Sequence, residues 1–198
     1  SKNDVLRGDD RVDTDLGVEH ELNQAGIDRI SGLAGLLPAG TTSFNAGNII
    51  IGGAGSDLIE GRGGNDIIDG DAWLNTRLSV RNPANPASEI GSAEGMNKPY
   101  LVGNTRTLQT AVFNKLVDPE NIVITREILS DANGVDTALF SGPRANYTIT
   151  TSGSRITVTD NVGTDGADTL THVERLRFPN GDGTFQTVVT AVPNAPTN

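Results

Sequence analysis

The sequence has no cysteine and few aromatic residues, with one tryptophan, two tyrosines and five phenylalanines among 198 residues. The absence of cysteine excludes disulfide bonds, thiolate metal sites and a cysteine nucleophile. The small aromatic content, beside a hydrophobic fraction of 35%, predicts a thin and largely aliphatic core. No apolar run approaches the roughly 18 residues that a membrane-spanning helix needs, so no membrane span is expected.

Basic residues are also scarce, because 15 lysines and arginines stand against 25 acidic residues, a formal net charge of −10. An acidic surface repels phosphate backbones and attracts small cations, so no nucleic-acid partner is expected. Glycine, in contrast, is abundant at 24 residues. Since glycine adopts backbone angles that other residues avoid, this content predicts many turns joined by short strands.

Catalytic signatures are missing as well. The two histidines, His20 and His172, have no partner at metal-ligand spacing, and His172 begins a run that is typical of a strand. The sequence holds neither a nucleophile elbow nor a phosphate-binding loop. We therefore expect that this chain is not an enzyme.

What the sequence does contain is a repeat of nine residues. Residues 52–60 read GGAGSDLIE, and residues 61–69 read GRGGNDIID. The step before, residues 43–51, is degenerate in its turn but keeps apolar residues at the strand positions. The step after, residues 70–75, keeps its first glycine and then loses the pattern.

This repeat resembles the G-G-x-G-x-D-x-U-x nonapeptide of the RTX, or haemolysin-type, calcium-binding family, in which U is a large apolar residue. Residues 52–60 match every fixed position, and residues 61–69 miss only the second glycine, which is Arg62 here. The resemblance implies a parallel β-roll, in which turns that bind calcium alternate with short strands. We therefore expect a mainly β fold: a short calcium-binding parallel β-roll with a mixed α/β and β-hairpin extension.

Calcium suits such turns because it prefers about six to eight oxygen ligands, drawn from carboxylates and main-chain carbonyls. Asp57 and Asp66 stand at the sixth position of their repeats and would supply the carboxylates. Asp69, at a ninth position, is expected to point away from the turn. The predicted metal-binding residues are Asn45, Gly47, Asn48, Gly52, Ala54, Gly55, Asp57, Gly61, Gly63, Gly64, Asp66, Gly70, Asp71, Ala72 and Asp168.

The register of the repeat also predicts which turns meet. In a roll, turns two repeats apart lie on the same edge, so the 43–48 turn should pair with the 61–66 turn and the 52–57 turn with the 70–75 turn. Asn48 and Asn75 then occupy aspartate positions. The eighth positions are expected to stack as one interior column, made of Ile50, Ile59 and Ile68.

Two further segments carry part of the pattern. Residues 3–8, NDVLRG, match the second half of a repeat, and residues 163–171, GTDGADTLT, match a whole repeat except at Thr164. Asp4 and Asp168 in these segments either cap the main run, form separate sites or belong to ordinary Asp-Gly turns.

The chain is predicted to have four segments. The third contains one helix within residues 101–116 and a hairpin over residues 147–159. The last is rich in proline and reads as a linker, so we expect a monomeric fragment of a larger polypeptide. The segments are an N-terminal cap with the partial repeat, an acidic loop and a short helix before Pro38 (1–42), the repeats (43–75), the mixed extension (76–190) and the linker (191–198).

A second resemblance concerns the flanking sequence. NYTIT from Asn146 and DGADTLTHVERLRF from Asp165 resemble a unit found beside RTX repeats in secreted bacterial proteins. Residues 71–75, DAWLN, directly after the repeats, resemble the region downstream of the haem-peroxidase domain in large RTX-type peroxidases. No peroxidase chemistry can be placed on this chain.

These patterns together predict a calcium-binding structural module of a secreted, extracellular bacterial RTX protein, which couples its folding and stability to calcium. Calcium is the expected cofactor, and the family resemblance adds type I secretion. Two alternatives stay open. One is a calcium-dependent self-processing module that cleaves the bond between Asp118 and Pro119. The other is an adhesion or ligand-binding domain that calcium makes rigid.

Overall fold

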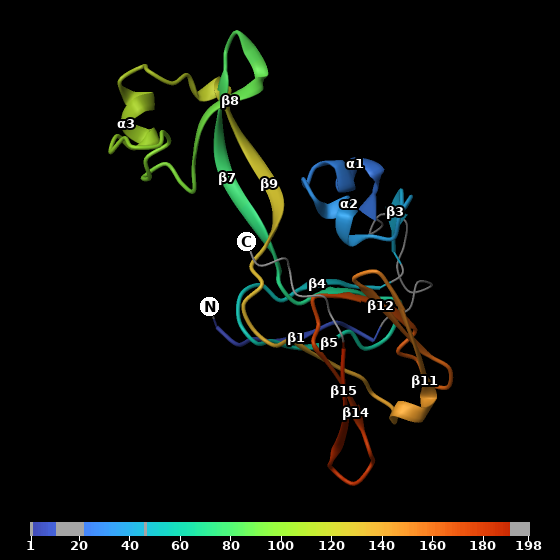
Figure 1. The fold of residues 1–198 in the computed structure, drawn as a ribbon. Helices are drawn as coiled ribbons and strands as arrows, with labels where there is room; N and C mark the ends of the chain where they lie inside the picture. Colours follow the sequence, from blue (N-terminus) through green and yellow to red (C-terminus); the bar gives the residue numbers. More distant parts are fainter. Residues whose placement is uncertain (1, 11–21, 46, 191–198) are drawn as a thin grey trace. The chain divides into compact units, whose positions relative to one another are not determined.

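The computed structural model describes residues 2–10, 22–45 and 47–190, and the chain divides into two compact units (Figure 1). Unit 1 consists of Ser1–Trp73 and Ile128–Asn198, and unit 2, Leu74–Glu127, is inserted between them. The predicted boundary after residue 75 falls near the start of unit 2, while the predicted segment 76–190 contributes to both units. Part of the predicted acidic loop and the predicted linker lie outside the described residues.

The fold is mainly β, and unit 1 contains two five-stranded sheets. The first sheet has the order β1 (Val5–Arg7), β5 (Leu58–Glu60), β10 (Thr137–Leu139), β14 (Arg175–Pro179) and β15 (Phe185–Val189). The second sheet has the order β11 (Tyr147–Ser152), β12 (Arg155–Asp160), β13 (Ala167–Thr171), β6 (Ile67–Asp69) and β4 (Ile49–Ile51).

The short strands of the repeats pair in parallel and alternate between the two sheets. β4 and β6 pair in the second sheet, so that Ile50 lies beside Ile68, while β5 lies between β1 and β10 in the first sheet. The three predicted repeat strands are therefore confirmed. The single column predicted for Ile50, Ile59 and Ile68 is wrong, because successive turns send Ile59 to the other sheet.

One core fills the space bounded by both sheets. In each coil the core residue is the second one after an acidic or amide side chain, as in Asp57-Leu58-Ile59. The residue in between faces outward. The seven core positions of this kind are Leu6, Ile50, Ile59, Ile68, Ala138, Leu170 and Leu176, and all belong to the same hydrophobic cluster.

Additional elements of unit 1 cover the outer face of the second sheet. The helix predicted before Pro38 is two helices, α1 (Gln24–Asp28) and α2 (Leu33–Leu36), because Gly32 takes a left-handed φ of 85° between them. With the small hairpin of β2 (Leu22–Asn23) and β3 (Ser43–Phe44), they pack on outward-facing strand residues. These contacts form a second, separate hydrophobic cluster. It contains Ile27, Leu37 and Ile67, with Leu22, Leu36, Phe44 and Ile49 at its margin.

The predicted hairpin over residues 147–159 is confirmed. β11 and β12 pair antiparallel from Tyr147–Asp160 to Ser152–Arg155, and β12 continues the second sheet through β13. The short helix η4 (Arg144–Asn146) precedes the hairpin. The strand expected from His172 begins instead at Arg175, because His172 takes a left-handed φ of 51° in a turn.

Unit 2 has its own three-stranded sheet and core (Figure 1). Its strands lie in the order β8 (Asn85–Ala93), β7 (Ala72–Asn82) and β9 (Ile122–Ser130). The helix predicted within residues 101–116 is limited to α3 (Leu108–Phe113), which begins after Thr107 caps it, and η3 (Pro119–Asn121) precedes β9. Among the described residues, no helix is long and apolar enough to cross a membrane.

Candidate functional site

Acidic side chains, four of them buried, and one amide stack in two rows beside the parallel strands of unit 1. We call the first row the Asp66 ladder; it consists of Asn48, Asp66 and Asp168, which stand at or next to the starts of β4, β6 and β13. The Asn48 N–H donates to Asp66 Oδ1 at 2.7 Å, and the Asp66 N–H donates to Asp168 Oδ1 at 2.9 Å. Each carboxylate thus accepts a main-chain hydrogen bond from the neighbouring turn.

The second row, the Asp57 ladder, repeats this arrangement beside the first sheet. It consists of Asp4, Asp57, Asp136 and Glu174, each directly before a parallel strand. The N–H groups of Asp4, Asp57 and Asp136 each donate to the carboxylate of the next member, and all three distances are 2.7 Å. The spacing of the strands therefore sets the spacing of the carboxylates.

Three of these carboxylates have an oxygen that the protein leaves unsatisfied. Asp57, Asp66 and Asp136 are 2%, 0% and 1% exposed. Their Oδ2 atoms are buried and have no hydrogen-bond partner among the described residues. Burying an ionised carboxylate without a counter-charge is costly, so such oxygens call for a cation or a proton. The donor set of hard carboxylate oxygens beside glycine-rich turns fits calcium.

Glycines at the start of each turn leave room for these oxygens. A Cβ on Gly52 would lie 2.8 Å from Asp57 Oδ2 and would also clash with the carbonyl oxygen of Gly70. A Cβ on Gly61 would clash with Asp66 Oδ2. Arg62 replaces the second glycine of its repeat and takes a left-handed φ of 71°, so the turn keeps its course at a backbone cost of about 1–2 kcal/mol.

Most of the predicted metal-binding residues lie in the stacked turns. Gly47, Asn48, Asp66 and Asp168 lie together with the 61–64 turn. On the other side of the stack, the turn that contains Gly52, Ala54, Gly55 and Asp57 meets Lys2, Gly70 and Gly134. Of the predicted pairing of the 43–48 turn with the 61–66 turn, the contacts of Gly47 and Asn48 with Asp66 are observed. Of the predicted pairing of the 52–57 turn with the 70–75 turn, the contact of Gly52 with Gly70 is observed.

Three predicted positions lie elsewhere. Asn45 follows β3, which pairs with β2 and not with the stacked strands. Asn75 lies in β7 within unit 2, where its amide donates to Glu127 at 2.8 Å, so its predicted place in an aspartate position is wrong. Ala72 begins β7, and its N–H donates to Asp69. After Gly70 the chain leaves the stacked turns and enters β7. The nine-residue register of the sequence does not indicate this departure.

The sequence reasoning missed two members of the Asp57 ladder, Asp136 and Glu174. Both precede an apolar residue by two positions, as in Asp136-Thr137-Ala138 and Glu174-Arg175-Leu176. This short acidic-x-apolar signal is shared with all the other ladder positions except that Asn48 carries an amide. Gly134 also precedes Asp136 by two positions, as Gly55 precedes Asp57, so this half-repeat could have been found in the sequence. Glu174 has no such glycine, and the acidic-x-apolar pattern alone is too common to be specific.

Asp69, at a ninth position, was expected to point out from its strand and away from the turn, but it is buried and contacts the turns on either side. It is 2% exposed, accepts from the Ala72 N–H at 2.8 Å and the Thr171 hydroxyl at 2.8 Å, and pairs with His172 Nδ1 at 3.1 Å. Burial opposes its ionisation, but the hydrogen bonds from His172 and Thr171 outweigh burial and lower the pKa of Asp69. Asp69 is thus a satisfied structural carboxylate, in contrast to Asp66.

Three ladder carboxylates, Asp66, Asp136 and Asp168, have a raised pKa, in contrast to Asp69. Burial raises the pKa of Asp66 to about 6 and that of Asp136 to about 7. For Asp168, burial and then the neighbouring charge of Asp66 raise the pKa to about 9. These groups therefore resist ionisation as long as only protein atoms surround them.

This electrostatic pattern predicts how pH affects the calcium-free protein. A carboxylate whose pKa is raised on folding stabilises the fold below its unfolded value, near 4, and loses that contribution as pH rises through its folded value. For Asp66, Asp136 and Asp168 this window extends from about 4 to about 9. We expect the Tm of calcium-stripped protein, followed by circular dichroism, to fall between pH 5 and pH 8. A Tm that rises over this interval would contradict the burial of these charges.

Asp118, the residue of the proposed self-cleavage, lies in unit 2 before η3. Its carboxylate accepts from the Glu120 N–H at 3.0 Å, and this contact caps the short helix that begins with Pro119. The observed geometry is that of a helix cap, and it gives the self-processing alternative no support.

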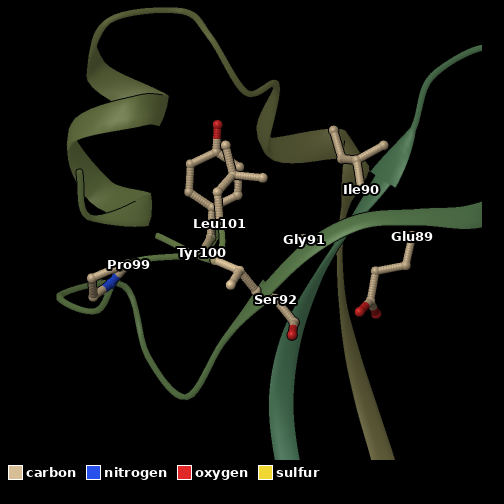
Figure 2. Close-up of a pocket in the computed structure, with 8 residues that line it drawn as sticks. Glu89, Ile90, Gly91, Ser92, Pro99, Tyr100 and Leu101 are labelled. Atoms are coloured by element: carbon tan, nitrogen blue, oxygen red, sulfur yellow. The ribbon is translucent and has the colours of Figure 1, made fainter. Parts of the chain in front are cut away.

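A cavity of about 360 Å³ lies on unit 2 beside β8 (Figure 2). Ile90 and Glu89 project to opposite sides of β8, and Tyr100 and Leu101 form another part of the wall (Figure 2). Glu89 is already engaged by Arg77 at 2.5 Å and by the Ser79 hydroxyl. The wall of this cavity is partly polar and partly apolar, and its one carboxylate, Glu89, already has hydrogen-bond partners. The cavity therefore gives the adhesion alternative no specific ligand.

Comparisons with known proteins add little to this geometry. No protein-family model matches the sequence, and no curated protein matches it. Among solved structures, the extracellular lipase LipA from Serratia marcescens is similar over 73% of this chain, with 17% identity and a TM-score of 0.25. The match covers 16% of the lipase chain, so this chain spans a small part of that protein's length. A likeness at this TM-score carries no argument about function.

Proposed function

We propose that this chain is a calcium-binding structural module of a secreted bacterial protein, with unit 1 as a short parallel β-roll that calcium stabilises. One observation carries the proposal: within the part of the chain that the structure describes, the buried Oδ2 atoms of Asp57, Asp66 and Asp136 have no partner. The ion pairs formed by the described lysines and arginines use other carboxylates, among them Glu60 and Glu127. Bound cations would supply the missing positive charge.

The ions would lie between stacked turns, where carboxylates and carbonyl oxygens converge. Asp66 with the 61–64 turn would hold one, and Asp57 with the 52–55 turn would hold another. In the described part of the chain, no three His, Asp or Glu side chains are grouped so that they could hold a metal by themselves. Main-chain carbonyl oxygens would therefore contribute most ligands, which calcium accepts more readily than magnesium does.

Coupling of folding to calcium follows from this arrangement. Without calcium, buried carboxylates in each ladder repel one another and oppose the stack. With calcium, binding to the folded state alone stabilises it by mass action. The resemblance of residues 52–69 to RTX repeats supports an extracellular setting, where calcium is abundant, and export of the unfolded chain before calcium is met.

A count of bound ions tests the proposal directly. We expect equilibrium dialysis of the stripped protein against calcium at about 0.01–1 mM to show two or more ions per chain, since each ladder offers at least one buried carboxylate of the kind calcium binds in this range. A tenfold excess of magnesium should not displace them, because magnesium prefers a tighter octahedral shell at about 2.0–2.1 Å. Protein that binds no calcium at 1 mM would refute the proposal.

A further inference from the structure

We propose that Gly70 and Asp136 are the two halves of one cation-binding turn, interrupted by the insertion of unit 2, and that the Asp136 carboxylate is a ligand there. This inference rests on the proposed function but names a site that no nine-residue repeat marks. In sequence, 66 positions separate the two residues (136 − 70). In an uninterrupted repeat the sixth position would be Asn75, which instead lies in unit 2.

The surroundings of Gly70 match those of Gly52, which opens the complete 52–57 turn. A Cβ on Gly52 would lie 2.8 Å from Asp57 Oδ2 and clash with the carbonyl oxygen of the next coil, that of Gly70. A Cβ on Gly70 would lie 2.5 Å from Asp136 Oδ2 and clash with the carbonyl oxygen of the next coil, that of His172. Asp136 therefore stands to Gly70 as Asp57 stands to Gly52.

Main-chain hydrogen bonds place the two halves in one coil of the chain, between the coil that contains the 52–57 turn and the coil that contains His172. The Gly52 N–H donates to Asp69 O at 2.9 Å, and the Gly70 N–H donates to Thr171 O at 3.1 Å. On the returning half, the Thr137 N–H donates to Asp57 O at 2.8 Å. The chain thus leaves this coil after Gly70 and returns to the same coil before Thr137.

The Asp136 side chain is directed into this split turn, and one of its oxygens has no partner in residues 2–10, 22–45 and 47–190. Its Oδ1 accepts the Asp57 N–H at 2.7 Å, while its Oδ2 is buried, unsatisfied and next to Gly70. Asp57, Asp71 and Glu174, all acidic, act on it electrostatically. A concentration of negative charge around a buried, unpartnered oxygen favours a divalent cation at this point.

A cation there would tie together the chain before and after unit 2. The Asp131 N–H already donates to Asp71 O at 3.1 Å, so the two strands of chain meet at the level of the split turn. Binding at Gly70 and Asp136 would fix both in unit 1. Calcium would then order the segments 70–73 and 131–136 in the same step as the 52–57 turn.

Hydrogen exchange on the unaltered chain, with calcium and after its removal, tests the split turn without any substitution. We expect peptides covering residues 70–73 and 131–136 to gain protection together, at the calcium concentration that protects residues 52–57. Protection of residues 52–57 without any change in residues 131–136 would overturn the inference.

Two variants separate the competing registers. Asp136→Asn should bind one calcium ion fewer per chain, or bind one ion about tenfold more weakly, because it removes a charged ligand. Asn75→Ala, at the position that the uninterrupted register assigns, should bind the same number of ions as the unaltered chain. Unchanged binding by Asp136→Asn beside a loss in Asn75→Ala would overturn the inference and leave the proposed function standing. Unaltered chain that binds no calcium would overturn both.

Discussion

Calcium at 1 mM is expected to raise the Tm of unit 1 by about 10–20 °C over the value in chelator. An ion that binds the folded state alone stabilises it by about 2.7 kcal/mol at a concentration of 100 Kd. Two such sites contribute about 5 kcal/mol, and a domain of roughly 150 residues gains about 2–4 °C per kcal/mol. Differential scanning calorimetry measures the shift.

Magnesium at the same concentration is the matched control. Because it dehydrates reluctantly and fits carbonyl-rich turns poorly, it should shift the Tm by no more than a few degrees. Renewed chelation should return the Tm to its starting value. Equal shifts with both ions would indicate general screening of the −10 net charge and not specific sites.

The second large effect concerns Asp66→Asn, which should raise the free energy of unfolding without calcium and lower it with calcium. In chelator at pH 8, Asp66→Asn should be more stable than the unaltered protein by about 1–3 kcal/mol, because it removes a buried charge without a counter-charge. Asp66 is fully buried, and burial raises its pKa to about 6. In 1 mM calcium the same variant should be less stable, because a ligand is lost. Urea unfolding in the two conditions gives both free energies.

Asp28→Asn makes the same chemical change on the exposed surface of α1, where the carboxylate accepts only a side-chain hydrogen bond from Gln24 among the contacts of the described residues. It should alter stability by less than about 0.5 kcal/mol in either condition. Asp69→Asn provides a second comparison, because Asp69 is buried but satisfied by His172 and Thr171. It should destabilise the protein both with and without calcium. If Asp66→Asn behaved like Asp69→Asn, Asp66 would be a structural carboxylate and no ligand.

The local pattern was sufficient to identify the repeat strands and their turns. Residues 49–51, 58–60 and 67–69 form short strands as predicted, and Ile59 and Ile68 are buried. This succeeds because a nine-residue unit contains its own turn glycines and its own core residue, so each part of it is encoded by adjacent residues. The hairpin of β11 and β12 follows from the same kind of local information.

Which segments join the stack was decided by the tertiary structure. Asp4, Asp136 and Asp168 stand in the ladders because strands distant in sequence pair in parallel with β5 or β6. Glu174 joins them because β14 pairs in parallel with β10. Closing a longer loop costs only about 0.6 kcal/mol for each doubling of its length, so a whole unit can interrupt a turn at small expense. The sequence by itself determined the chemistry of each turn. Parallel pairing across long insertions determined which turns share an edge, since that pairing depends on contacts that no nine-residue window contains.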